Sequence, residues 1–132
     1  MAEHDLKAVI QAADRAIGAE DFDAVMAFYA DDAVLVVKPG LEARGRAQIR
    51  TAHERIAAHF GHRLTVRQGR MTVLEAGDTA LVLMESLIES VDAGGATQTE
   101  TRRATYVFRK AADGRWLCVI DNSYGTDLID AA

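Results

Sequence analysis

The strongest constraint on the fold of this chain is the segment 79–124, which has the pattern of three long antiparallel strands joined by two hairpins. The predicted strands cover residues 79–90, 99–110 and 115–124, and they are rich in β-branched, aromatic and aliphatic side chains. Glycine-containing turn sequences at 92–95 and 112–114 separate them. Both faces of these strands carry apolar side chains, so we expect both sides of the sheet to be covered.

The turn at 112–114 predicts the register of the second hairpin. If the turn is tight, Lys110 pairs with Arg115, and Tyr106 then lies opposite Val119. Because side chains alternate along a strand, one face would carry a mixed polar and apolar set. This set is Arg102, Ala104, Tyr106, Phe108, Leu117, Val119, Asp121 and Ser123. Trp116, Cys118 and Ile120 would lie on the opposite, outer face.

Length and charge limit the possible functions. The 132 residues suit a single domain, residues 1–132, with one hydrophobic core. A net charge of −5 and scattered arginines argue against a nucleic-acid or membrane surface. The single cysteine, Cys118, lies among apolar residues and is expected to be a buried, unreactive thiol. Without a signal-peptide pattern or a membrane span, the sequence predicts a cytoplasmic protein.

The N-terminal half has the periodicity of three helices. Asp5 is a candidate cap for the first, which ends near Gly18, and Asp21 caps the second, whose apolar face includes Tyr29. A short apolar run at 33–37 and a loop to residue 45 precede the third helix at 46–60. A weaker strand at 63–75 changes its apolar parity near Gly69, which predicts a bulge. The fold class is therefore α+β, a curved antiparallel sheet wrapped on three N-terminal helices.

Three stretches of the sequence carry a resemblance to a known family. They are DFDAVMAFYADDAVLVV at 21–37, GRAQI at 45–49 and DGRWLCVIDNSYG at 113–125. In these the chain resembles the nuclear transport factor two-like superfamily, and within it ketosteroid isomerase-like and SnoaL-like proteins, especially the SgcJ/EcaC-type branch. The resemblance implies a cone-shaped α+β barrel with a pocket between helices and sheet, and commonly a homodimer. It does not fix the activity, because the superfamily includes isomerases, cyclases, dehydratases and association domains.

The residues that ketosteroid isomerases use are not retained. By this resemblance the general base falls at Val37, the oxyanion tyrosine at Ala13 and its partner aspartate at Tyr106, while a supporting tyrosine falls at His53. An alkyl side chain cannot carry a proton, so we expect no steroid isomerisation by that mechanism.

The candidate site is the set of polar side chains expected on the concave face. Asp121, His53 and Tyr106 are the candidate catalytic residues, and Arg102, Ser86, Ser123 and Met84 are candidate substrate-binding residues. An acid on an apolar strand should be desolvated, which raises its pKa towards the range useful for proton transfer. Alternatively, Arg102 pairs with Asp121 in a structural salt bridge. His53 and Tyr106 could likewise be packed core residues with one hydrogen-bond partner each.

The sequence contains no motif for a metal site or a nucleotide site. The four histidines form no HExxH pair, and no glycine-rich phosphate loop is present, so the sequence predicts neither a metal nor a nucleotide cofactor. Asp31 and Asp32 are expected at a helix end, where they would cap and solvate it.

Two functional classes remain. The first is a small isomerase, cyclase or dehydratase that transfers a proton on a hydrophobic carbonyl compound, with Asp121 or His53 moving the proton. The second is a binding or association module that uses the same pocket for a small hydrophobic molecule without chemistry.

The outer sheet face predicts a homodimer. Its expected apolar band consists of Leu81, Leu83, Val107, Trp116, Cys118 and Ile120. Such a band is unusual on a soluble monomer and would suit a two-fold interface. The alternative is that the C-terminal segment 125–132 folds back and covers it.

Overall fold

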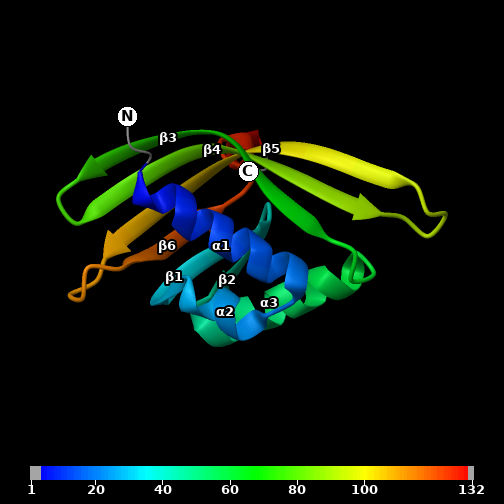
Figure 1. Ribbon diagram of the computed structural model, residues 1–132, viewed down its shortest axis with the longest axis horizontal. Helices are drawn as coiled ribbons and strands as arrows, with labels where there is room; N and C mark the ends of the chain where they lie inside the picture. The colour runs from blue at the N-terminus through cyan, green and yellow to red at the C-terminus, as the bar shows by residue number, and fades with distance from the viewer. Residues whose placement is uncertain (1–3, 131–132) are drawn as a thin grey trace.

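The computed structural model describes residues 4–130 and has an open six-stranded sheet that arches over the helices (Figure 1). The helices are α1 (Asp5–Ala19), α2 (Phe22–Ala27), α3 (Gly45–His59) and α4 (Asp127–Asp130). The strands are β1 (Tyr29–Lys38), β2 (Leu41–Arg44), β3 (Thr65–Ala76), β4 (Thr79–Val91), β5 (Thr97–Lys110) and β6 (Trp116–Asn122). Their order in the sheet is β2-β1-β6-β5-β4-β3.

The α+β class, with α1, α2 and α3 on the concave side of a curved sheet, is confirmed (Figure 1). The sheet is mixed rather than purely antiparallel, because β1 and β6 pair in parallel. It is also open, with β2 and β3 as its edges. No helix among residues 4–130 is both long and apolar enough to cross a membrane.

The N-terminal elements follow their caps. The Asp21 side chain accepts a hydrogen bond from the Ala24 N–H at 3.2 Å, so the expected cap of α2 is confirmed. At α1 the cap is His4, one residue earlier than expected, whose Nδ1 accepts from the Leu6 N–H at 3.1 Å. α2 ends at Ala27, so Tyr29 begins β1 instead of continuing the helix, which the sequence interpretation missed.

The region between α2 and α3 contains more strand than expected. Asp31 and Asp32 lie on β1 and form ion pairs with Arg46 and Arg109, so the prediction that they cap a helix was wrong. Leu41–Arg44, expected to be a loop, is strand β2. It pairs with β1 as a hairpin, and Gly40 has the positive φ of 84° that this tight connection needs.

The expected bulge in β3 is confirmed, because its register with β4 shifts between Gln68 and Met71. In β6 the expected register was wrong. Lys110 pairs with Trp116 rather than Arg115, and the register shifts again at Val119, which is an extra residue between Cys118 and Ile120.

The hairpin register and the β6 bulge together decide which side chains of β6 face the core. Trp116 and Cys118, expected on the outer face, are buried on the concave side at 7% and 0% exposure. After the extra residue the alternation restarts, so Asp121 also faces inward, opposite Tyr106. The hairpin register therefore turns Trp116 and Cys118 inward, contrary to expectation, and the bulge after them keeps Asp121 on the concave face where the sequence predicted it.

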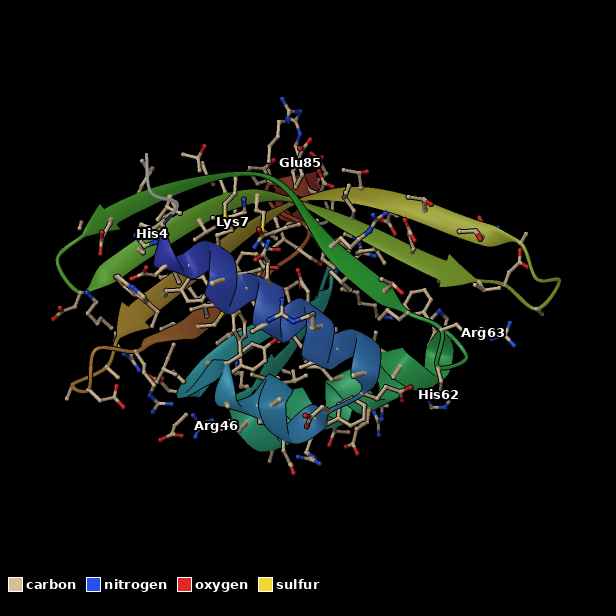
Figure 2. The ribbon with its side chains drawn as sticks, viewed as in Figure 1. His4, Lys7, Arg46, His62, Arg63 and Glu85 are labelled. Atoms are coloured by element: carbon tan, nitrogen blue, oxygen red, sulfur yellow. The ribbon has the colours of Figure 1, made fainter. Side chains whose placement is uncertain are left out.

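The outer sheet face keeps part of the expected apolar band. Leu83 and Ile120 are 42% and 41% exposed, and Leu81 and Val107 beside them are partly exposed. Figure 2 shows Glu85 on the side of the sheet away from α1, α2 and α3. Beyond β6 the chain turns back at Gly125, whose carbonyl accepts a hydrogen bond from the Asn122 side chain at 3.1 Å.

Gly125 should tolerate no larger side chain. Its φ is +56°, and a Cβ atom there would lie 2.2 Å from the Arg103 carbonyl oxygen. Gly77 is a matched control, with a φ of +58° and open space around it. We expect Gly125→Ala to lower the free energy of unfolding in urea by about 2 to 4 kcal/mol and Gly77→Ala by about 1 kcal/mol. Equal losses would show that the contact with Arg103 contributes nothing.

Candidate functional site

A cavity of about 120 Å³ lies between the helices and the concave sheet face. It brings together residues that are far apart in the sequence. The expected site residues that line it are His53, Ser86, Arg102, Tyr106, Asp121 and Ser123. The remaining expected residue, Met84, is buried in the core and does not line the cavity. Asp14 on α1 is an additional polar lining residue.

Asp121 and His53 are linked through Tyr29. The Tyr29 hydroxyl donates to Asp121 Oδ2 at 2.6 Å, and the same hydroxyl oxygen lies 2.9 Å from His53 Nε2. Since the single hydroxyl proton points at Asp121, His53 donates from Nε2, which assigns the Nε2–H tautomer to its neutral ring. Burial lowers the pKa of His53 to about 4, so the imidazole is neutral at pH 7.

Tyr29 is held in place by neighbouring elements. Arg46, at the start of α3 (Figure 2), donates from Nη2 and Nε to the Tyr29 carbonyl oxygen at 2.6 and 3.1 Å. The Cys118 N–H on β6 donates to the Phe28 carbonyl at 2.9 Å. These contacts fix the backbone on both sides of Tyr29, so its hydroxyl is a positioned donor to Asp121.

Asp121 lacks the ion pair that the sequence interpretation offered as an alternative. Arg102 instead donates to Glu100 at 2.9 Å and to Ser123 at 3.0 Å, and it lies over the Tyr124 ring. Burial raises the pKa of Asp121 to about 6, against the opposing effect of the Tyr29 hydrogen bond. Asp121 is therefore mostly ionised at pH 7 yet close to its pKa, which suits proton transfer.

Asp14 is a second carboxyl group in the cavity, and the sequence interpretation missed it. It is only 7% exposed, and its Oδ2 has no hydrogen-bond partner among residues 4–130. Burial and the charge of Asp121 raise its pKa to about 7, opposed by Arg15. A signal was present, because Asp14 follows Ile10 by four residues and precedes Ile17 by three, on the apolar stripe of α1.

Two hydroxyl groups of the cavity wall are free to meet a ligand. Within residues 4–130, neither Tyr106 nor Ser86 makes a side-chain hydrogen bond, although both are buried. Burial and the nearby carboxyl groups raise the pKa of Tyr106 well above its ordinary value. Tyr106 therefore keeps its proton and can donate a hydrogen bond to an oxygen atom placed in the cavity.

Cys118 lies in the core beside this network rather than in the cavity wall. Burial raises the pKa of its thiol well above the ordinary value, so it stays protonated. In the part of the chain that the structure describes, no three His, Cys, Asp or Glu side chains cluster in a way that could hold a metal ion.

Comparison with known families identifies the family of this chain. The SnoaL-like domain matches residues 6–120. The chain belongs to the SnoaL-like family. None of the curated proteins compared with this SnoaL-like chain matches it significantly. The narrower assignment to the SgcJ/EcaC-type branch stays a prediction.

Solved structures similar to the SnoaL-like chain establish its fold. Aln2 from a Streptomyces species has a TM-score of 0.80 at 19% identity, with 95% of this chain and 91% of that chain covered. An NTF2-like protein with a cystatin-like fold from Novosphingobium aromaticivorans has 0.75 at 21%, with 88% and 76% covered. A protein from Streptomyces avermitilis, named as a candidate dehydratase of the NTF2-like family, has 0.72 at 22%, with 89% and 91% covered. At these identities the similarity shows the fold alone.

The Asp14 carboxyl should make stability depend on pH. Its pKa is 3.8 in the unfolded chain and about 7 in the folded protein, so the folded state binds more protons between these values. The free energy of unfolding therefore falls as pH rises from about 4 to 7. Asp121 acts in the same direction up to about pH 6, whereas His53, with its pKa lowered from 6.5 to about 4, acts in the opposite direction.

Replacing Asp14 isolates its contribution to the pH dependence of stability. Asn is nearly isosteric and cannot ionise, so we expect Asp14→Asn to be about 1 to 3 kcal/mol more stable than wild type at pH 8. This advantage should shrink as pH falls towards 4. Urea unfolding from pH 4 to pH 8 measures it, with the exposed Asp78→Asn as control. A difference between Asp14→Asn and wild type that did not vary with pH would contradict a raised Asp14 pKa.

Proposed function

We propose that this SnoaL-like protein catalyses proton transfer next to the carbonyl group of a small hydrophobic compound. The observation that carries the proposal is the presence of two carboxyl groups, the partly buried Asp121 and the buried Asp14, in one cavity with the Tyr106 hydroxyl, which makes no hydrogen bond within residues 4–130. Carboxyl groups with pKa values near neutrality can accept and donate protons at physiological pH.

Asp121 is the proposed general base. In the proposed step a carbon–hydrogen bond beside the carbonyl breaks and its proton goes to the Asp121 carboxylate. The electron pair moves onto the carbonyl oxygen as an enolate. Tyr106 and protonated Asp14 are the proposed donors to that oxygen, and Tyr29 with His53 orients Asp121. Return of the proton from Asp121 to another carbon would complete an isomerisation. In a dehydration the enolate would re-form the carbonyl and a carbon–carbon double bond, and the β-hydroxyl would take the proton from Asp121 and leave as water.

A second candidate function is non-catalytic binding of a small hydrophobic molecule in the same cavity. Val37 favours this alternative, because it lines the cavity at the position where the resemblance to ketosteroid isomerases places a base. Under this alternative, Asp14 and Tyr106 would bind a polar group without a reaction. We also propose a cytoplasmic location, which suits the free Cys118 thiol.

Exchange of α-protons with solvent deuterium tests the catalytic proposal without knowledge of the natural substrate. Cyclohexanone and 2-tetralone are suitable enolisable probes, followed by proton NMR in D₂O. We expect wild type to accelerate exchange of at least one probe and Asp121→Asn to lower that rate by about two to four orders of magnitude. Asp78→Asn is the matched control. Acceleration that Asp121→Asn leaves intact would remove Asp121 as the base, and no acceleration of either ketone would favour binding alone.

We further propose that the outer sheet face packs against a second copy of this chain. The interface would contain Leu81, Leu83, Val107 and Ile120, which adjoin across β4, β5 and β6. Light scattering at micromolar concentration should give twice the 14.3 kDa chain mass, and Ile120→Arg should give a monomer. Leu41→Arg, on the β1–β2 hairpin and similarly exposed, should stay dimeric. A monomeric wild type would refute the dimer.

A further inference from the structure

The cavity is too small to hold a whole substrate of ordinary size. Its volume of about 120 Å³ is well below the roughly 300 to 1,000 Å³ typical of small-molecule sites. It can take a carbonyl group and its nearest carbon atoms. The remainder of the molecule must therefore lie in adjoining space.

Such space is present between α3 and the β1–β2 hairpin. A groove of about 500 Å³ lies there, and Val37 and Ile56 line both the groove and the cavity. Its wall is mostly apolar and includes Leu41, a large side chain that is 47% exposed. A groove with such a wall favours an apolar ligand.

The charges of the groove favour an anion. Arg55 lines it and, within residues 4–130, forms no ion pair or hydrogen bond. The one acidic lining residue, Glu42, is already paired with Arg44 at 2.5 Å. The uncompensated charge at the groove is therefore positive, and a guanidinium group binds carboxylate or sulfonate oxygens through charge-assisted hydrogen bonds.

We propose that the groove binds the non-reacting part of the substrate, and that this part is apolar and carries an anionic group held by Arg55. This inference rests on the proposed function for the placement of the carbonyl group in the cavity. Binding in the groove itself does not require catalysis, so the two can fail separately.

Two fluorescent probes with the same ring system test the groove. 8-Anilinonaphthalene-1-sulfonate is anionic, and N-phenyl-1-naphthylamine lacks the sulfonate. We expect both to bind wild type. Arg55→Gln should lower the affinity for the anionic probe about three- to tenfold and change the affinity for the neutral probe less than twofold. Arg50→Gln removes an equal charge from the other side of α3, where Arg50 pairs with Asp23, and should change neither.

Thr51→Trp places a large side chain in the groove from an exposed helix position and should weaken both probes at least fivefold. Urea unfolding of each variant checks that it is folded. Probe binding that Thr51→Trp leaves intact, or equal effects of Arg55→Gln on both probes, would overturn the proposal. Retained charge discrimination together with no ketone exchange in wild type would instead refute the proposed catalysis and leave the groove as a binding site.

Discussion

The extra residue Val119 in β6 is the feature on which the rest of the site depends. In a regular strand that buries Trp116 and Cys118, the next inward side chain would be residue 120, and Asp121 would face solvent. The bulge adds one residue, so the strand contributes two core side chains and then a carboxyl group to the same face. β6 lies between β1 and β5, and this central place brings Asp121 within reach of Tyr29 on one side and opposite Tyr106 on the other.

The burial that raises the pKa values of Asp14 and Asp121 also lowers the stability of the folded protein. Asp14 Oδ2 has no protein partner among residues 4–130, and a buried polar atom without a hydrogen bond destabilises a fold by about 1 to 3 kcal/mol. Around Asp121 the protein supplies neutral groups, a tyrosine hydroxyl and an uncharged imidazole, instead of a cation. A cation in their place would lower the Asp121 pKa. The polar groups of this cavity thus stay available to a ligand at a cost in the stability of the fold, which is typical of functional sites.

Periodicity predicted much of this fold because it depends on local pattern. The long strands, the bulge near Gly69 and the inward faces of His53 and Tyr106 all follow from apolar spacing. The β6 register could not be predicted in this way, because a bulge depends on how the strand pairs with both of its neighbours. β2 was missed because four residues carry too little pattern. Tyr29 was misassigned because α2 ends two residues before it, and Asp14 was overlooked although its helical spacing was visible.

The two carboxyl groups of this cavity, Asp14 and Asp121, are expected to change protonation near neutral pH. Carbon-13 NMR of the aspartate side-chain carboxyl groups tests it directly, with the Asp14 and Asp121 signals assigned from the Asp14→Asn and Asp121→Asn spectra. We expect two apparent pKa values for the interacting pair, at about 6 and about 7. Two values near the ordinary aspartate pKa of about 3.9 would contradict it.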